Sequence, residues 1–165
     1  MLETADDKKI TVLAGGFLDL AYMDVAENGD IYITEQGRHL VHGLSPDGKK
    51  RTIVAGNGTT DEPIDNKPAT EIGLNEVRGI ALLPKGGFLV CTHKGGYIVH
   101  VSSDGIANVL IRGSGEGTIH TDDGEPITKP GDKISEPRSV TLAPNGDVII
   151  TCNDSGFVRI IPRGR

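Results

Sequence analysis

Three segments of this chain repeat one pattern of apolar runs and turns. Aligned on their turn glycines, Gly29, Gly86 and Gly146, the segments match along their whole length and cover residues 21–45, 78–102 and 138–162. The glycines are 57 and 60 residues apart. A repeat of this kind is usually one supersecondary unit that cannot bury its apolar face alone, so neighbouring units stack. We therefore expect an array of similar units packed side by side.

Each repeat has the pattern of an antiparallel meander. The turns Asn28-Gly29-Asp30 and Asn145-Gly146-Asp147 lie between β-rich runs, which is a hairpin signal. A third run follows in every unit, and in the first two units an Asp-Gly turn leads to a fourth, at residues 51–55 and 107–111. With Gly 23, Pro 9 and only 4% aromatic residues, the composition also favours many short strands. The sequence predicts an all-β fold of four-stranded units.

The third unit contains only three of the four expected strands. Residues 10–16 resemble residues 52–58, around the fourth strand of the first unit, and no first three strands precede them. We expect this N-terminal strand to complete a terminal sheet, because an unpaired edge invites aggregation. The resulting plan is a single domain, 1–165, with a closing strand at 10–16 and sheets at 21–56, 77–113 and 137–165.

Such units are typical of a β-propeller, in which about 4–8 four-stranded sheets, the blades, surround a channel. Three blades are too few to close that ring. We expect two chains to form a six-bladed homodimer, in which each N-terminal strand completes the last blade of the other chain. The alternative is that the chain corresponds to half of a longer propeller.

The repeats resemble a known family. Residues 54–58, followed by 67–75 and 77–81, are similar to the linker and opening strand of bacterial NHL repeats. That resemblance implies a six-bladed propeller used for binding. Residues 88–93 and 139–146 resemble, more weakly, the gluconolactonase family of metal-dependent propeller hydrolases. This second resemblance implies a metal-binding Glu in an early Glu-Gly-Pro motif, where this chain has Leu18-Asp19-Leu20-Ala21-Tyr22.

The charge and the distribution of apolar residues exclude some classes of partner. The net charge is −6, with no long run of either sign, so a surface that tracks nucleic-acid phosphates is not expected. No apolar run is long enough to span a bilayer, so we expect a soluble protein that does not bind membranes. No signal peptide is visible, and the sequence does not predict the cellular compartment. Cys91 and Cys152 are interpreted as buried apolar residues rather than a disulfide or zinc site.

A binding site is expected at the end of the blades that carries the long linkers, residues 56–77 and 113–137, because loops of this length are often functional. The repeat places polar residues on the inner rim of that end. These are Arg78 and Arg138 at the start of first strands, and Glu35, Gln36, Thr92, His93, Asn153 and Asp154 at the end of second strands.

Each of these candidates has a functional and a structural interpretation. Arg78 and Arg138 could hold a carboxylate or phosphate, or pair with linker acids such as Glu76 and Glu136. His93 could be a general base or a ligand, or simply a solvated side chain. The run Asp122-Asp123-Gly124-Glu125 could bind calcium, or be a solvated acidic loop. No metal site and no cofactor is assigned.

Three functions remain open. The first is a binding or scaffold propeller with a polar pocket for a small molecule or peptide at the mouth of its channel. The second is a hydrolase or lyase that uses His93, Asn153, Asp154 and Glu35, with or without a divalent metal such as calcium. The third is a purely structural, self-assembling propeller. The fold alone does not separate them.

Overall fold

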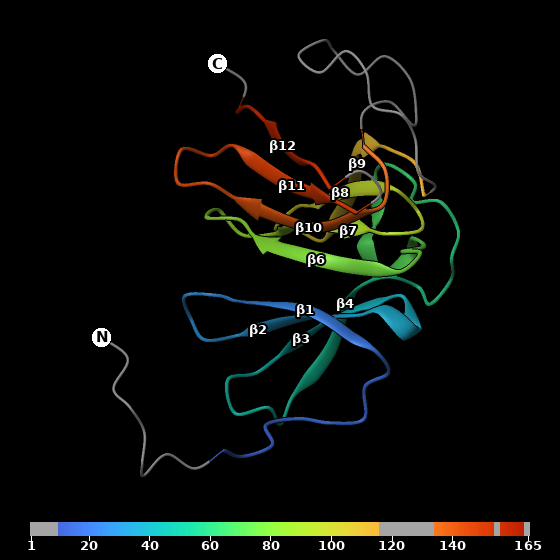
Figure 1. The fold of residues 1–165 in the computed structure, drawn as a ribbon. Helices are drawn as coiled ribbons and strands as arrows, with labels where there is room; N and C mark the ends of the chain where they lie inside the picture. The colour runs from blue at the N-terminus through green and yellow to red at the C-terminus, as the bar shows by residue number, and fades with distance from the viewer. Residues whose placement is uncertain (1–9, 116–133, 154–155, 164–165) are drawn as a thin grey trace.

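The computed structural model describes residues 10–115, 134–153 and 156–163, and in them the chain forms three antiparallel sheets (Figure 1). Blade 1 is a four-stranded meander of β1 (Leu20–Val25), β2 (Ile31–Glu35), β3 (Leu40–Leu44) and β4 (Arg51–Ala55). Blade 2 contains β6 (Val77–Leu82), β7 (Phe88–Thr92), β8 (Tyr97–Val101) and β9 (Ile106–Arg112). Blade 3 contains β10 (Pro137–Leu142), β11 (Val148–Cys152) and β12 (Val158–Ile161).

The linker between blades 1 and 2 adds two short elements. β5 (Lys67–Pro68) pairs with β9 and becomes a fifth strand at the outer edge of blade 2. The 3-10 turn η2 (Ala69–Glu71) follows it, and a second 3-10 turn, η1 (Gln36–Arg38), joins β2 to β3. In the part of the chain that the structure describes, no helix is long and apolar enough to cross a bilayer.

The three blades stand side by side with their first strands, β1, β6 and β10, next to one another (Figure 1). The tight turns lie at one end of the sheets, which we call the turn end. At these turns Gly29, Gly86 and Gly146 adopt positive φ angles of 86°, 86° and 90°, which a residue with a Cβ rarely adopts. The loops after the second strands and the long linkers lie at the other end, which we call the loop end.

Two apolar layers join the blades, because alternate residues of a strand point to opposite faces. Between blades 1 and 2, Val41 packs in a cluster with Phe88 and Val90. Between blades 2 and 3, a second cluster contains Leu89 and Ile150, together with both free cysteines. The interpretation of Cys91 and Cys152 as buried residues is confirmed, and burial raises the pKa of the Cys91 thiol to about 12.

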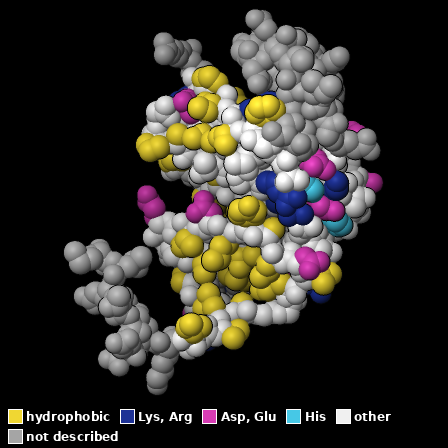
Figure 2. All heavy atoms as spheres, in the orientation of Figure 1, with side chains coloured by type: hydrophobic (Ala, Val, Ile, Leu, Met, Phe, Trp, Pro, Cys, Tyr) yellow, Lys and Arg dark blue, Asp and Glu magenta, His cyan; other side chains and the backbone are white. Residues whose placement is uncertain are grey.

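The two outer faces of this stack are only partly covered within one chain. On blade 1, Met23 is 62% exposed, whereas the repeat-equivalent Ile80 of blade 2 is 6% exposed because blade 1 covers it. On the far side of blade 3, Val158 is 67% exposed, whereas the equivalent Ile98 is fully buried. Figure 2 shows hydrophobic side chains spread over the surface that blade 1 presents. On both faces, therefore, the exposed apolar residues are the repeat equivalents of residues that are buried between blades elsewhere in the chain.

The strand expected at residues 10–16 does not form within the single chain. These residues have no strand conformation, and the partner strands of β12 do not include them. They run beside blade 1, where the Leu13 carbonyl lies against Gly48 in the turn between β3 and β4. Phe17, which is one repeat before Leu74, packs on the ring of His42. Residues 13–18 thus run along blade 1 in the way that the linker runs along blade 2.

Candidate functional site

The loop end is organised around one acidic residue in each repeat. Asp19, Glu76 and Glu136 directly precede the first strands at the repeat spacing, and all three have positive φ angles, of 50°, 52° and 43°. In this conformation the backbone carbonyl of each residue accepts the N–H of the residue after the second strand of its own blade. The donors are Gln36, His93 and Asn153, with N–O distances of 2.9, 2.9 and 3.2 Å. The three donors therefore occupy equivalent positions, as the repeat alignment predicts.

His93 lies between the carboxylates of two of these acids. Its side chain is 6% exposed, its Nδ1 is 3.0 Å from Glu76 Oε2, and its Nε2 is 3.9 Å from Glu136 Oε2. Lys94, the next residue, places its Nζ 2.7 Å from Glu136 Oε1. The histidine thus joins the linker before blade 2 to the linker before blade 3. Figure 2 shows basic, acidic and histidine side chains gathered at this end of the molecule.

The surrounding charges keep both carboxylates ionised. Burial alone would raise the pKa of Glu76, but the hydrogen bond to His93 and the nearby positive charges, including that of Arg78, lower it overall. The pKa of Glu136 is lowered mainly by the hydrogen bond from Lys94, against a smaller effect of burial. With Glu76 accepting from Nδ1–H, the second ring nitrogen of His93 is an acceptor in the neutral ring and a donor in the protonated ring.

The two rim arginines keep unused donors. Arg78 Nη2 lies 3.6 Å from Glu76 Oε2, which is an ion-pair contact within the same rim. The Nε atoms of Arg78 and Arg138 are buried and have no hydrogen-bond partner among the described residues, and the same holds for Nε2 of His93. Buried donors and acceptors are nearly always paired in proteins, so each of these three atoms is a position where an ordered water or a ligand group would be stabilised.

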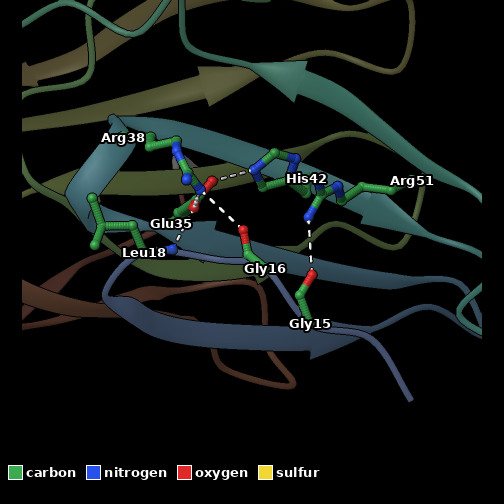
Figure 3. A network of polar contacts seen from close by, with 7 residues as sticks. All are labelled: Gly15, Gly16, Leu18, Glu35, Arg38, His42 and Arg51. Atoms are coloured by element: carbon green, nitrogen blue, oxygen red, sulfur yellow. Dashed lines mark hydrogen bonds and ion pairs between the residues drawn. The ribbon is translucent and has the colours of Figure 1, made fainter. Parts of the chain in front are cut away.

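Glu35 does not join this cluster, although the sequence places it on the same rim. It ends β2, and its side chain points away from blade 2, because the hydroxyl of the preceding Thr34 faces that blade and donates to the Arg78 carbonyl (2.5 Å). Figure 3 shows Glu35 instead in a network on the outer face of blade 1. Its carboxylate accepts the Leu18 N–H (2.6 Å), shares a hydrogen bond with His42 Nε2 (2.6 Å), and accepts from Arg38.

The same network holds residues 15–18 on blade 1. The guanidinium of Arg38 donates to the Gly16 carbonyl (3.2 Å), and that of Arg51 donates to the Gly15 carbonyl (3.4 Å) (Figure 3). Burial would raise the pKa of Glu35, but its three hydrogen bonds lower it overall. Glu35 therefore has a structural role, which corrects its assignment to the ligand or catalytic site.

The remaining candidates are only partly placed. Asn153 hydrogen-bonds the Glu136 carboxylate and lowers its pKa, so it belongs to the cluster. Asp154 and the acidic run at residues 122–125 lie outside the described residues. Among the residues that are described, no three His, Cys, Asp or Glu side chains are arranged to hold a metal ion.

Sequence reasoning missed part of the cluster. Lys94 and His39 were not expected there, yet Lys94 pairs with Glu136 and His39 Nδ1 accepts the N–H of Glu76 (3.1 Å). Glu76 and Glu136 were expected only as partners of the arginines, and the signal that could have placed one acid in each repeat is the recurrence of Asp19, Glu76 and Glu136 at the spacing of the turn glycines. It was overlooked because the linkers that contain them differ in length and composition.

No protein-family model and no curated protein matches this chain. Solved structures do match it. An auxiliary nutrient binding protein from Bacteroides thetaiotaomicron superposes with a TM-score of 0.67 and 15% identity, over 85% of this chain and 36% of that one. A gluconolactonase from Xanthomonas campestris gives a TM-score of 0.57 and 15% identity, with coverage of 85% and 36%. A virginiamycin B lyase from Staphylococcus aureus gives 0.51 and 18%, with 87% and 42%.

These neighbours are propeller-type proteins. The three sheets are propeller blades. The chain spans between 36% and 42% of the length of the three neighbours named above. At this level of identity the similarity shows the fold and leaves the activity open, because one fold carries many functions.

Proposed function

We propose that the protein is a binding propeller that holds a small hydroxy acid, or a peptide carboxylate, at its loop end. The observation that carries this proposal is a set of three buried atoms that have no hydrogen-bond partner among the described residues: Nε of Arg78, Nε of Arg138 and Nε2 of His93. Arginine donors suit a carboxylate, and Nε2 of His93 suits a hydroxyl group, which can both donate and accept a hydrogen bond. A small hydroxy acid offers a partner of each kind.

Calorimetry with gluconate, a carboxylate that also carries hydroxyls, tests this site. Arg78→Gln and Arg138→Gln should each weaken gluconate binding by about tenfold, the loss expected for one charged hydrogen bond. Arg51→Gln is the matched control, because Arg51 lies on blade 1 away from the cluster and should leave binding unchanged. Equal gluconate affinity in all four proteins, or no binding of gluconate or inorganic phosphate to the wild type, would contradict the proposal.

A hydrolase or lyase is the second candidate, and the pairing of Glu76 with His93 favours it. A carboxylate 3.0 Å from Nδ1 orients the ring and leaves Nε2 free to take a proton. Hydrolysis of gluconolactone above the spontaneous rate, lost in His93→Gln while Arg51→Gln retains it, would favour this candidate. Gluconate binding without any turnover would favour the binding protein.

We also propose that the ring of blades is completed by a second copy of the chain, as a six-bladed propeller of the NHL type. The support is the match between the two outer faces. Leu20 and Met23 on blade 1 are exposed, whereas their equivalents Val77 and Ile80 on blade 2 are buried by the preceding blade. The exposed outer face of blade 3, which includes Val158, would pack on blade 1 of the second copy as the preceding blade of the ring. Exchange of residues 10–16 into blade 3 of the partner belongs to the same proposal.

A further inference from the structure

A groove runs between blades 2 and 3 at the turn end, opposite the loop-end cluster. Its volume is about 790 Å³, within the range of about 300–1,000 Å³ usual for small-molecule sites. The groove lies between two turns that the repeat makes equivalent. Its walls are formed by the turn after β6 and the turn after β10, which contribute Leu82, Leu83, Pro84, Leu142, Ala143 and Pro144.

The polar part of the groove lining is basic. Lys85 and Arg163 line it, together with His100 from β8, and none of the described residues that line it is acidic. The Arg163 side chain lies over the turn at Gly146. Asp147, in the same turn, is engaged by the amide of Asn145 and by the Arg163 backbone N–H (2.8 Å). An apolar slot with cations at its mouth has the chemistry to bind an anion with an aliphatic body.

The repeat identifies a polar contact between blades 1 and 2 that its equivalent residues in blades 2 and 3 do not make. At the first interface Asp24 Oδ2 accepts the N–H of Leu82 (2.8 Å) and pins blade 1 to blade 2. At the second interface the equivalent residues are Ala81 and Leu142, and an alanine has no side-chain acceptor.

We propose that the groove between blades 2 and 3 binds an aliphatic carboxylate. The chain of the ligand lies between the two Leu-Pro walls, and its carboxylate is paired with Lys85 and Arg163. This site is separate from the loop-end cluster, so its test does not depend on the function proposed above.

Amide chemical-shift titration of the protein with decanoate tests the proposal, with decanol as the uncharged ligand of the same chain length. Decanoate should shift the amides of residues 82–86 and 142–146 and bind about three- to tenfold tighter than decanol, because its carboxylate is near two exposed cations. Lys85→Gln combined with Arg163→Gln should reduce decanoate affinity to that of decanol and leave decanol affinity unchanged. Equal affinity of the two ligands for the wild type would overturn the proposal, as would shifts confined to the outer face of blade 1.

Ala81→Asp and Ala81→Asn introduce at blade 2 the acceptor that blade 1 already has in Asp24. Both variants should narrow the groove and weaken decanol and decanoate, and Asp should weaken decanoate further because it adds a negative charge. Ala81→Ser, with a shorter side chain, is the size control. Undiminished decanoate binding in a folded Ala81→Asp protein would contradict the proposal. If that variant does not fold, the Lys85 and Arg163 variants still test the proposal.

Discussion

Glu35 shows how one carboxylate can organise a surface. It is 1% exposed, and it satisfies the Leu18 N–H, His42 and Arg38 at once. A buried carboxylate is costly unless it is paired, and here every partner comes from blade 1 or from the segment that lies on it. The network therefore fixes residues 15–18 and does not contribute to the loop-end cluster.

Glu35→Gln should destabilise the protein by about 1–3 kcal/mol at pH 7, because the amide cannot accept from all three donors. The folded state lowers the pKa of Glu35 below its ordinary value of 4.5, so its stabilisation is complete above that value and is lost as the pH falls through the folded pKa. Urea unfolding at pH 7 and pH 3 should show a smaller acid-induced loss of stability in Glu35→Gln than in the wild type. Equal losses in the two proteins would contradict this account.

The Asp24 carboxylate is the link between blades 1 and 2 at the turn end. It reaches across from β1 to the backbone of β6, which is the first strand of the next blade. A hydrogen bond between strands of different sheets fixes their spacing, and Ala81, the repeat equivalent of Asp24 in blade 2, has no side-chain acceptor to make one.

Asp24→Ala should lower the free energy of unfolding by about 1–2 kcal/mol, because the Leu82 N–H loses its partner in a half-buried position. It should also raise hydrogen exchange at Leu82. Glu27→Ala, which removes an exposed carboxylate from the neighbouring turn, is the control and should leave both quantities unchanged. Unchanged exchange at Leu82 in Asp24→Ala would show that the hydrogen bond does not hold the interface.

The outer faces of blades 1 and 3 determine the oligomeric state that we expect for the chain. Apolar faces of this kind are usually buried against a partner, and the repeat identifies a blade as the partner that fits. We therefore expect the wild type to sediment with the mass of two chains.

Met23→Glu should give a folded monomer, because it places a charge on the exposed face of blade 1 without touching the contacts between blades 1 and 2. Glu27→Ala should remain a dimer. Deletion of residues 1–16 should also disrupt the dimer if the N-terminal segment is exchanged, whereas a soluble dimer of the deleted chain would refute the exchange. A wild type that sediments as a monomer would refute ring closure by a second copy.

Local patterns in the sequence were sufficient for the blades. The turn glycines, the alternating apolar runs and the repeat spacing fix strands, turns and their order, because hairpins depend on residues close together in the chain. They also place Gln36, His93 and Asn153 at equivalent positions, which the shared hydrogen bonds confirm.

Contacts between distant residues decided the rest. The repeat alone could not show that Glu35 faces away from blade 2, because the direction of a side chain at the end of a strand depends on how the next blade packs. Nor could it place His93 between Glu76 and Glu136, which are 60 residues apart, or show that residues 10–16 lie along blade 1. Local interactions fix the conformation of each blade, whereas burial and charge pairing between blades determine which polar groups meet.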